Sequence, residues 1–86
     1  MKIKDGFILS NVAGKNIVVS VGNNDFSGML TLNETGVFFW NMLQKGTTKE
    51  QMLIEIRKEY DVSEREASED IDYFIRRLSD AKILED

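Results

Sequence analysis

The 86-residue sequence contains no cysteine, no histidine and no proline. The absence of cysteine excludes a disulfide framework, a thiolate nucleophile and a sulfur-ligated metal site. The absence of histidine removes the usual general base and the commonest side-chain ligand of transition metals. No apolar run approaches the length of a membrane-spanning helix, and the acid and glycine within residues 1–6 are wrong for a signal peptide. We therefore expect a soluble, cytoplasmic domain that is not an enzyme, holds no metal or cofactor and has no membrane partner.

Basic residues are outnumbered, with 11 Lys and Arg against 15 Asp and Glu, which gives a net charge of −4. Non-specific binding to DNA or RNA relies on the neutralisation of phosphates, so this balance argues against a nucleic-acid partner. The chain is too short for two domains, and we expect one domain over residues 1–86. Its 42% of apolar residues are enough to fill one modest core.

The first third of the chain has the pattern of β-strands. Apolar residues 7–12 and the β-branched residues 17–21 flank the turn-forming residues 13–16, which predicts an antiparallel hairpin. After a loop bracketed by glycines, residues 29–32 are expected to form a short third strand. All the strands are thus expected within residues 6–32.

The rest of the chain has the pattern of three helices, which we place within residues 33–82. Asn33 is a residue type that caps helix N-termini well, and it precedes a run with helical spacing. The residues that share the predicted buried stripe of this first helix are Gly36, Phe39, Trp40 and Leu43.

Two capping-box spacings predict where the other helices begin. Thr47 and Glu50 are expected to open the second helix, and Ser63 and Glu66 the third. The predicted inward residues of the second helix are Leu53, Ile56 and Tyr60. Those of the third helix are Ala67, Ile71, Phe74, Ile75 and Leu78.

Three strands followed by three helices predict an α+β fold, with a small three-stranded antiparallel sheet and a three-helix bundle. Because only residues 61–63 separate the last two helices, the bundle is expected to be winged helix-turn-helix-like. This arrangement raises a DNA-binding transcription regulator as the alternative function. A reading helix needs Arg, Lys, Asn or Gln in its first turns, yet residues 63–70 contain four acids and one Arg. These acids and Asp72 offer oxygen ligands for a cation, but they also suit the solvated start of a helix, which is the interpretation we favour.

The third predicted strand has one side unpaired in a three-strand meander. Proteins usually protect such an edge with Pro, a bulge or charge, and residues 29–32 contain no Pro, Lys, Asp or Glu. An unprotected edge is a template for a guest peptide that adds a strand through main-chain hydrogen bonds. The alternative, that the edge is covered by a loop or by a second copy of the chain, stays open.

Two segments of the sequence resemble the signature of the PqqD family, the pyrroloquinoline quinone (PQQ) synthesis protein D proteins. The residues that resemble its middle signature are Leu32-Asn33-Glu34-Thr35-Gly36, Trp40, Leu43 and Gly46-Thr47. The residues that resemble its C-terminal half are Tyr60-Asp61-Val62, Ala67, Asp70-Ile71, Phe74, Leu78 and Ile83-Leu84. A departure is Lys82, where relatives often carry Gly, and this departure is expected to alter the end of the last helix.

The resemblance implies a RiPP precursor peptide recognition element, a non-catalytic domain that binds the leader of a ribosomally made precursor peptide. Such a domain presents the leader to a modifying enzyme, commonly a radical SAM protein, as in coenzyme PQQ biosynthesis. The peptide-binding residues that the family implies on the third strand are Met29, Leu30, Thr31 and Leu32. Those that it implies on the third helix are Asp70, Tyr73, Phe74, Arg77 and Leu78. For Phe74 and Leu78 a core role is the alternative; an adaptor without peptide contact is another possible function, and monomer or dimer is left open.

Overall fold

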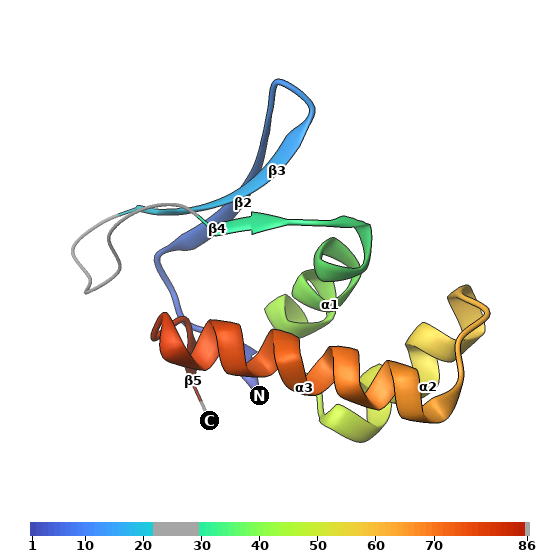
Figure 1. The fold of residues 1–86 in the computed structure, drawn as a ribbon. Coiled ribbons are helices and arrows are strands. Elements are labelled where there is room, and N and C mark those ends of the chain that lie inside the picture. Colours follow the sequence, from blue (N-terminus) through green and yellow to red (C-terminus); the bar gives the residue numbers. More distant parts are fainter. Residues whose placement is uncertain (22–29, 86) are drawn as a thin grey trace.

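The computed structural model describes residues 1–21 and 30–85 and contains three helices and five short strands in that part of the chain. The elements follow one another along the chain (Figure 1) as β1 (Lys2–Ile3), β2 (Phe7–Val12), β3 (Lys15–Ser20), β4 (Leu30–Leu32), α1 (Glu34–Lys45), α2 (Lys49–Glu59), α3 (Glu64–Asp80) and β5 (Leu84–Glu85). The predicted α+β class, with a three-stranded antiparallel sheet and three helices, is confirmed.

The three-stranded sheet has the antiparallel order β2-β3-β4. The β2–β3 hairpin closes through Ala13 and Gly14, which have φ angles of 53° and 80°. Positive φ at both central residues is typical of the type I′ turn, which matches the right-handed twist of the two strands. The third strand is observed over residues 30–32, and Met29 lies outside the described residues.

The expectation that all strands lie within residues 6–32 is wrong. A second sheet joins the two ends of the described chain, because β1 pairs antiparallel with β5. The amide of Lys4 also donates to the carbonyl oxygen of Ile83 at 2.8 Å. Ile3 and Ile83 are both buried, so this small sheet carries part of the core. Two-residue strands leave too little alternation in the sequence for a pattern to be recognised.

The end of α3 explains the position at which this chain departs from the PqqD pattern. The amide of Lys82 donates to the Ser79 carbonyl at 3.0 Å, and the amide of Ile83 donates to the Leu78 carbonyl at 2.9 Å. These two bonds are those of a Schellman motif, which requires a left-handed residue after the helix. Lys82 takes that conformation with φ 60°, although a side chain makes it costly. The helix therefore ends in the motif that usually has glycine at this position, with Lys82 in the left-handed conformation instead.

The helix starts follow the predicted capping chemistry with one shift. Ser63 caps α3, since its hydroxyl accepts from the Glu66 amide at 3.1 Å. The second helix is capped by Thr48 rather than the expected Thr47, and the Thr48 hydroxyl accepts from the Gln51 amide at 3.1 Å. Adjacent threonines offer two overlapping cap positions, and the sequence pattern alone does not distinguish them. No helix in the described residues is long and apolar enough to cross a membrane.

The core lies where α1 meets α3 and the sheet. The buried residues of α1 are the four of the predicted stripe, Gly36, Phe39, Trp40 and Leu43. Those of α3 are Ala67, Ile71, Phe74 and Leu78, also as predicted, while Ile75 is partly buried. In α2, however, Met52 is fully buried beside Ile56, whereas the predicted Leu53 and Tyr60 are only partly covered.

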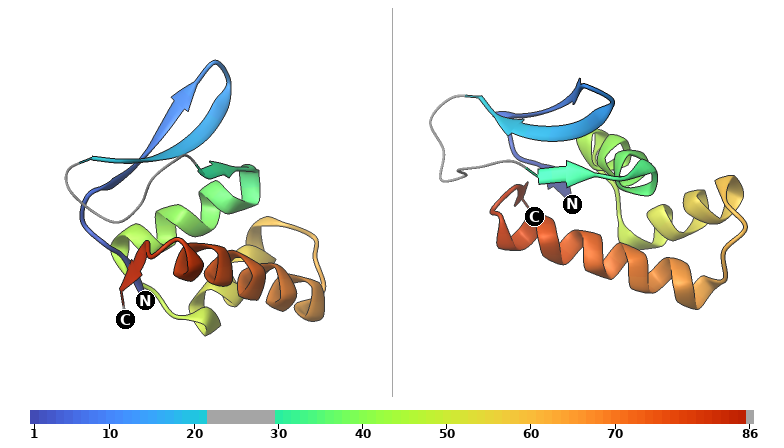
Figure 2. Two further views of the ribbon diagram at one scale, coloured as in Figure 1. Left: turned by 60° about the vertical axis from the view of Figure 1, so that its left-hand side comes forward. Right: turned by 45° about the horizontal axis from the view of Figure 1, so that its top comes forward.

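The β4 strand leads directly into α1, and α3 runs below both of them (Figures 1 and 2). In both views β4 lies between the β2–β3 hairpin and α3, and the tip of the hairpin extends beyond the helices. The Lys49 ammonium of α2 contacts the Asp72 carboxylate near the middle of α3 at 2.7 Å.

A contact between the start of α1 and the end of α2 involves two residues of the PqqD-like segments. The phenol of Tyr60 donates to the Glu34 carboxylate at 3.4 Å, and its ring packs edge-on against Phe38. Partial desolvation, together with the carboxylates of Glu34 and Glu59, raises the pKa of Tyr60. The shift extends the pH range over which the phenol acts as a hydrogen-bond donor further towards alkaline pH.

Replacement of Lys82 by glycine is expected to stabilise the protein. Lys82→Gly relieves a left-handed cost of about 1–2 kcal/mol, of which the greater freedom of the unfolded glycine chain takes back about 0.5–1 kcal/mol. We expect the free energy of unfolding to rise by about 0.5–1 kcal/mol. The measurement is urea unfolding followed by fluorescence of Trp40, the only tryptophan, which is buried. Lys45→Gly, in the last turn of α1, is the matched control and should lower stability by a similar amount. Equal losses in both variants would contradict a strained lysine.

Candidate functional site

The outer edge of β4 faces α3. Thr31 lies opposite Ile17 of β3, and its carbonyl oxygen accepts from the Arg77 guanidinium of α3 at 3.4 Å. In an antiparallel ladder, the N–H and C=O groups of a residue point to the same side. The N–H of Thr31 therefore also points away from β3, and no backbone partner for it lies in residues 1–21 or 30–85. Thr31 thus offers a donor and an acceptor to a further strand.

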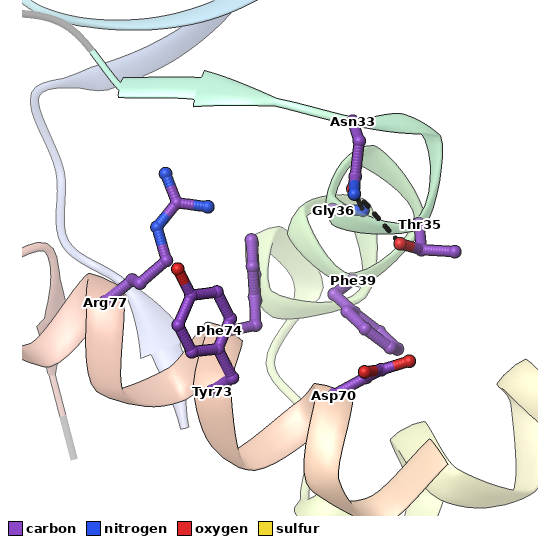
Figure 3. A pocket seen from close by; sticks show the side chains of 8 residues that line it. All are labelled: Asn33, Thr35, Gly36, Phe39, Asp70, Tyr73, Phe74 and Arg77. Carbon is purple, nitrogen blue, oxygen red and sulfur yellow. Dashed lines mark hydrogen bonds between the residues drawn. The ribbon is translucent and has the colours of Figure 1, made fainter. Parts of the chain in front are cut away.

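A pocket opens beside this edge, between the start of α1 and α3 (Figure 3). Its volume is about 120 Å³, which corresponds to about four water molecules at the density of liquid water. The residues that line it are Asn33, Thr35, Gly36, Phe39, Asp70, Tyr73, Phe74 and Arg77. This size suits one side chain rather than a large ligand.

The start of α1 forms one wall of the pocket and is held by the Asn33 side chain. Its Oδ1 accepts from the Gly36 amide at 2.8 Å and from the Thr35 hydroxyl at 3.1 Å. Both bonds fix the direction in which the chain turns from β4 into α1 (Figure 3). The Gly36 amide lies in the first turn of α1, where it has no partner within the helix, and Asn33 supplies that partner. The cap therefore fixes the position of the start of α1, which is one wall of the pocket.

Gly36 allows close packing at the same corner. A Cβ atom there would lie 3.2 Å from both Asn33 Oδ1 and Leu32 Cβ, and 3.4 Å from Cε1 of Phe74. A side chain at this position would therefore crowd the cap, the end of β4 and the aromatic floor at once. The glycine keeps α1 close to α3 and leaves the pocket between them open.

The side of the pocket formed by α3 combines an aromatic floor with charged groups at the rim. Phe74 is buried and packs against Phe39 with ring centroids 5.6 Å apart. Tyr73 is 64% exposed, and the Arg77 guanidinium lies 5.7 Å from the centre of its ring, within reach of a cation–π interaction. The carboxylate of Asp70 adds a negative group to the same lining. The site therefore offers apolar contact at its floor, and a hydrogen-bond donor and an acceptor at its rim.

The structure brings four residues predicted on the third helix to this pocket: Asp70, Tyr73, Phe74 and Arg77. On the strand, Thr31 is exposed, Leu30 is partly buried and Leu32 points into the core. Leu78 has no exposed surface and is part of the core, not of the pocket lining. Met29 lies outside the described residues. Peptide contact by these residues stays a prediction.

Four lining residues were not predicted as part of the site: Asn33, Thr35, Gly36 and Phe39. The information was present in the Leu32–Gly36 segment, which indicated a helix start and resembled the PqqD signature. Only the packing of Gly36 against Phe74 shows that the same segment also faces α3.

In the part of the chain that the structure describes, no three acidic side chains gather in an arrangement that could hold a metal ion. Two acidic residues of α3 have cationic partners instead. Asp72 contacts Lys49, and Glu69 accepts from Arg65 at 3.2 Å within the helix.

We call the outer edge of β4 together with the pocket beside it the groove. The fold and the groove define a small α+β domain with an unpaired sheet edge beside a helix. The family model described as Coenzyme PQQ synthesis protein D (PqqD) matches residues 9–84, and the chain belongs to this family. The solved structure "TbiB1 in Complex with the TbiA(beta) Leader Peptide" is similar with a TM-score of 0.80 and 24% sequence identity. The match covers 99% of this chain and 95% of that chain. No curated protein matches the sequence.

Loss of the Asn33 cap is expected to destabilise the corner. Asn33→Ala removes an acceptor for the Gly36 amide and should lower the free energy of unfolding by about 1 kcal/mol. Asn33→Asp keeps an oxygen in the same place and should retain the stability of the native protein. Urea unfolding measures both variants, and the amide resonance of Gly36 reports the bond directly. An Asp variant as unstable as the Ala variant would show that capping is not the role of Asn33.

Proposed function

We propose that this protein is a non-catalytic peptide-binding chaperone for a ribosomally synthesised precursor peptide. It binds the leader of that peptide by strand addition at β4 and presents it to a modifying enzyme. Membership of the PqqD family supports this function, as does the fold shared with a protein whose structure contains a leader peptide. The observation that carries the proposal is the outward N–H and C=O of Thr31, directly beside the pocket.

Strand addition at this edge determines where the side chains of the guest go. A guest residue that pairs with Thr31 exchanges two main-chain hydrogen bonds with it. Its neighbours lie opposite Leu30 and Leu32, whose side chains point inward, and residues opposite each other share one face of a sheet. The neighbouring side chains of the guest therefore point towards α3, where the pocket can receive one of them.

The chemistry of the lining predicts what the guest offers. The floor of Phe39 and Phe74 suits an apolar or aromatic side chain. Arg77 and Asp70 at the rim suit polar or charged groups that flank it. Because a disordered leader must be ordered on binding, moderate affinity is expected in spite of these contacts.

The partner enzyme and the location are further parts of the proposal. The modifying enzyme is expected to be a radical SAM protein or a similar enzyme, and the meeting place is the cytoplasm, where ribosomes make the precursor. The alternative DNA-binding function is not supported, since the first turns of α3 expose Glu64, Glu66 and Glu69 to solvent. These carboxylates would repel phosphates at the position where a reading helix enters DNA.

The edge of β4 can be tested with a proline. Thr31→Pro removes the outward N–H but leaves the pairing with β3 intact, since proline is tolerated where its nitrogen faces away from the sheet. Loss of one hydrogen bond of about 1 kcal/mol predicts leader binding at least about fivefold weaker. Titration of isotope-labelled protein with peptides encoded beside the gene measures the affinity by NMR.

Thr31→Ser is the matched control, because it keeps the backbone donor and should bind as the native chain does. In the native protein, amide shifts are expected at residues 30–32 and along α3. The absence of shifts at high leader excess, or equal binding by Thr31→Pro, would exclude strand addition at β4.

The helix side of the groove can be tested separately. Tyr73→Ser removes a mostly exposed ring from the pocket rim and should weaken leader binding about fivefold or more, as loss of an aromatic anchor does. Stability should change by less than about 0.5 kcal/mol, because the side chain is not part of the core. Ile54→Ser on α2 is the control: Ile54 is 51% exposed and lies away from the groove, so leader binding should be unchanged. Equal effects of the two variants would exclude Tyr73 as a contact.

A further inference from the structure

The sheet has a second edge at β2, and the hairpin turn determines which main-chain groups of residues 8–12 face outward along it. The two-residue turn makes Val12 and Lys15 a hydrogen-bonded pair. Because pairing alternates along an antiparallel ladder, Ser10 and Ile8 also bond to β3, whereas Leu9 and Asn11 do not. The N–H and C=O groups of Leu9 and Asn11 therefore point away from the sheet, and they have no backbone partner in the described residues.

The other edge provides an independent check of this assignment. If Ser10 bonds to Ile17, then Ile17 has no groups left for Thr31 on its other side. Thr31 must then face outward, which agrees with the bond from Arg77 to its carbonyl oxygen. The alternation is thus consistent across all three strands.

Nothing in the sequence of β2 protects its edge. The strand, Phe7–Val12, contains no charged residue and no proline, the two kinds of residue that usually prevent edge-to-edge pairing. It is also twice as long as β4, with six residues against three. The hairpin extends beyond the helices (Figures 1 and 2), which leaves this edge accessible near the turn.

The apolar side chains on one face of β2 are placed symmetrically about Ser10. Ile8 and Val12 lie on the same face of the strand, two positions before and after Ser10, because side chains alternate. They are 47% and 54% exposed, an unusual degree of exposure for large hydrophobic side chains. An apolar residue at equal distances on either side of one position is the pattern that a two-fold antiparallel pairing would bury.

We propose that β2 pairs antiparallel with β2 of a second copy of this chain, with the two-fold axis at Ser10. In this register, Leu9 lies opposite the second copy's Asn11, so the outward groups of both residues form hydrogen bonds in each half. Ile8 lies opposite the second copy's Val12 in a non-hydrogen-bonded pair, the kind in which side chains approach most closely. A two-fold axis at Leu9 would instead place Ile8 against Ser10 and leave Val12 without an apolar partner.

The resulting dimer has one continuous sheet in the order β4-β3-β2-β2-β3-β4. Both β4 edges remain at its ends, so the dimer keeps two separate copies of the groove. Two six-residue strands form an interface below the standard size of stable complexes, and the association is therefore weak and dependent on concentration.

Sedimentation equilibrium on the full chain, without any leader peptide, tests the dimer from low micromolar to millimolar concentration. The native protein should show a monomer–dimer equilibrium. Ile8→Lys and Val12→Glu should each remain monomeric, because each places a charge opposite an apolar residue. An equimolar mixture of the two variants should form a heterodimer, since one register places the new opposite charges together. Ile54→Lys on α2 and Thr31→Pro on β4 should dimerise as the native chain does.

A cysteine gives a direct readout of the register. The chain has no cysteine, so Ser10→Cys introduces a single thiol at the proposed axis, where the two Cα atoms lie within disulfide range. Mild oxidation should give a covalent dimer, whereas Ser79→Cys on the exposed face of α3 should not. A native protein that stays monomeric at every concentration would overturn the proposal. So would a dimer that survives Ile8→Lys, or a Ser10→Cys variant that does not cross-link.

Discussion

The turn from β4 into α1 is the constraint on which the candidate site depends. One side-chain oxygen, Oδ1 of Asn33, accepts hydrogen bonds from both the Gly36 amide and the Thr35 hydroxyl. That cap fixes the angle at which α1 leaves the sheet, and Gly36 then allows Leu32 and Phe74 to approach it closely. The cap, the end of the strand and the pocket floor are therefore one packing unit, so a change in any of them moves the wall of the groove.

The PqqD-like signature acquires a physical meaning from this unit. Leu32 anchors β4 in the core, Asn33 caps the helix, and Gly36 leaves room for α3. Glu34 reaches the phenol of Tyr60 at the end of α2. None of these roles requires contact with a ligand. The signature describes how the corner is built, and the surface for a guest follows from the corner.

The larger elements could be predicted from the sequence because they repeat a pattern over several turns. Four of the five residues predicted to face inward on α3 are buried and the fifth, Ile75, is partly buried, since seventeen residues repeat the helical period often enough to define a face. The buried face of α2 was predicted incorrectly, because its apolar residues are adjacent in the sequence. Met52 and Leu53 follow one another, and each defines a different inward face of the helix. The β1–β5 sheet was missed because pairing between the two ends of a chain leaves no local trace. Four residues of the α3 wall were implied by the resemblance to the PqqD family, whereas the wall formed by the start of α1 is shown only by tertiary packing.

The two edges of the sheet differ in what occupies them. At β4, the Arg77 guanidinium already contacts the Thr31 carbonyl, but at 3.4 Å and at an exposed position this bond is weak. A guest strand in the proposed complex replaces one long bond with two main-chain bonds of better geometry. When the guest replaces it at the Thr31 carbonyl, the Arg77 guanidinium is not left without partners, because it keeps its contacts with water and with the ring of Tyr73. Arg77 therefore satisfies the edge in the free protein at little cost to binding. At β2, the outward groups of Leu9 and Asn11 have no backbone partner in the described residues, and the exposed Ile8 and Val12 favour burial against an apolar surface.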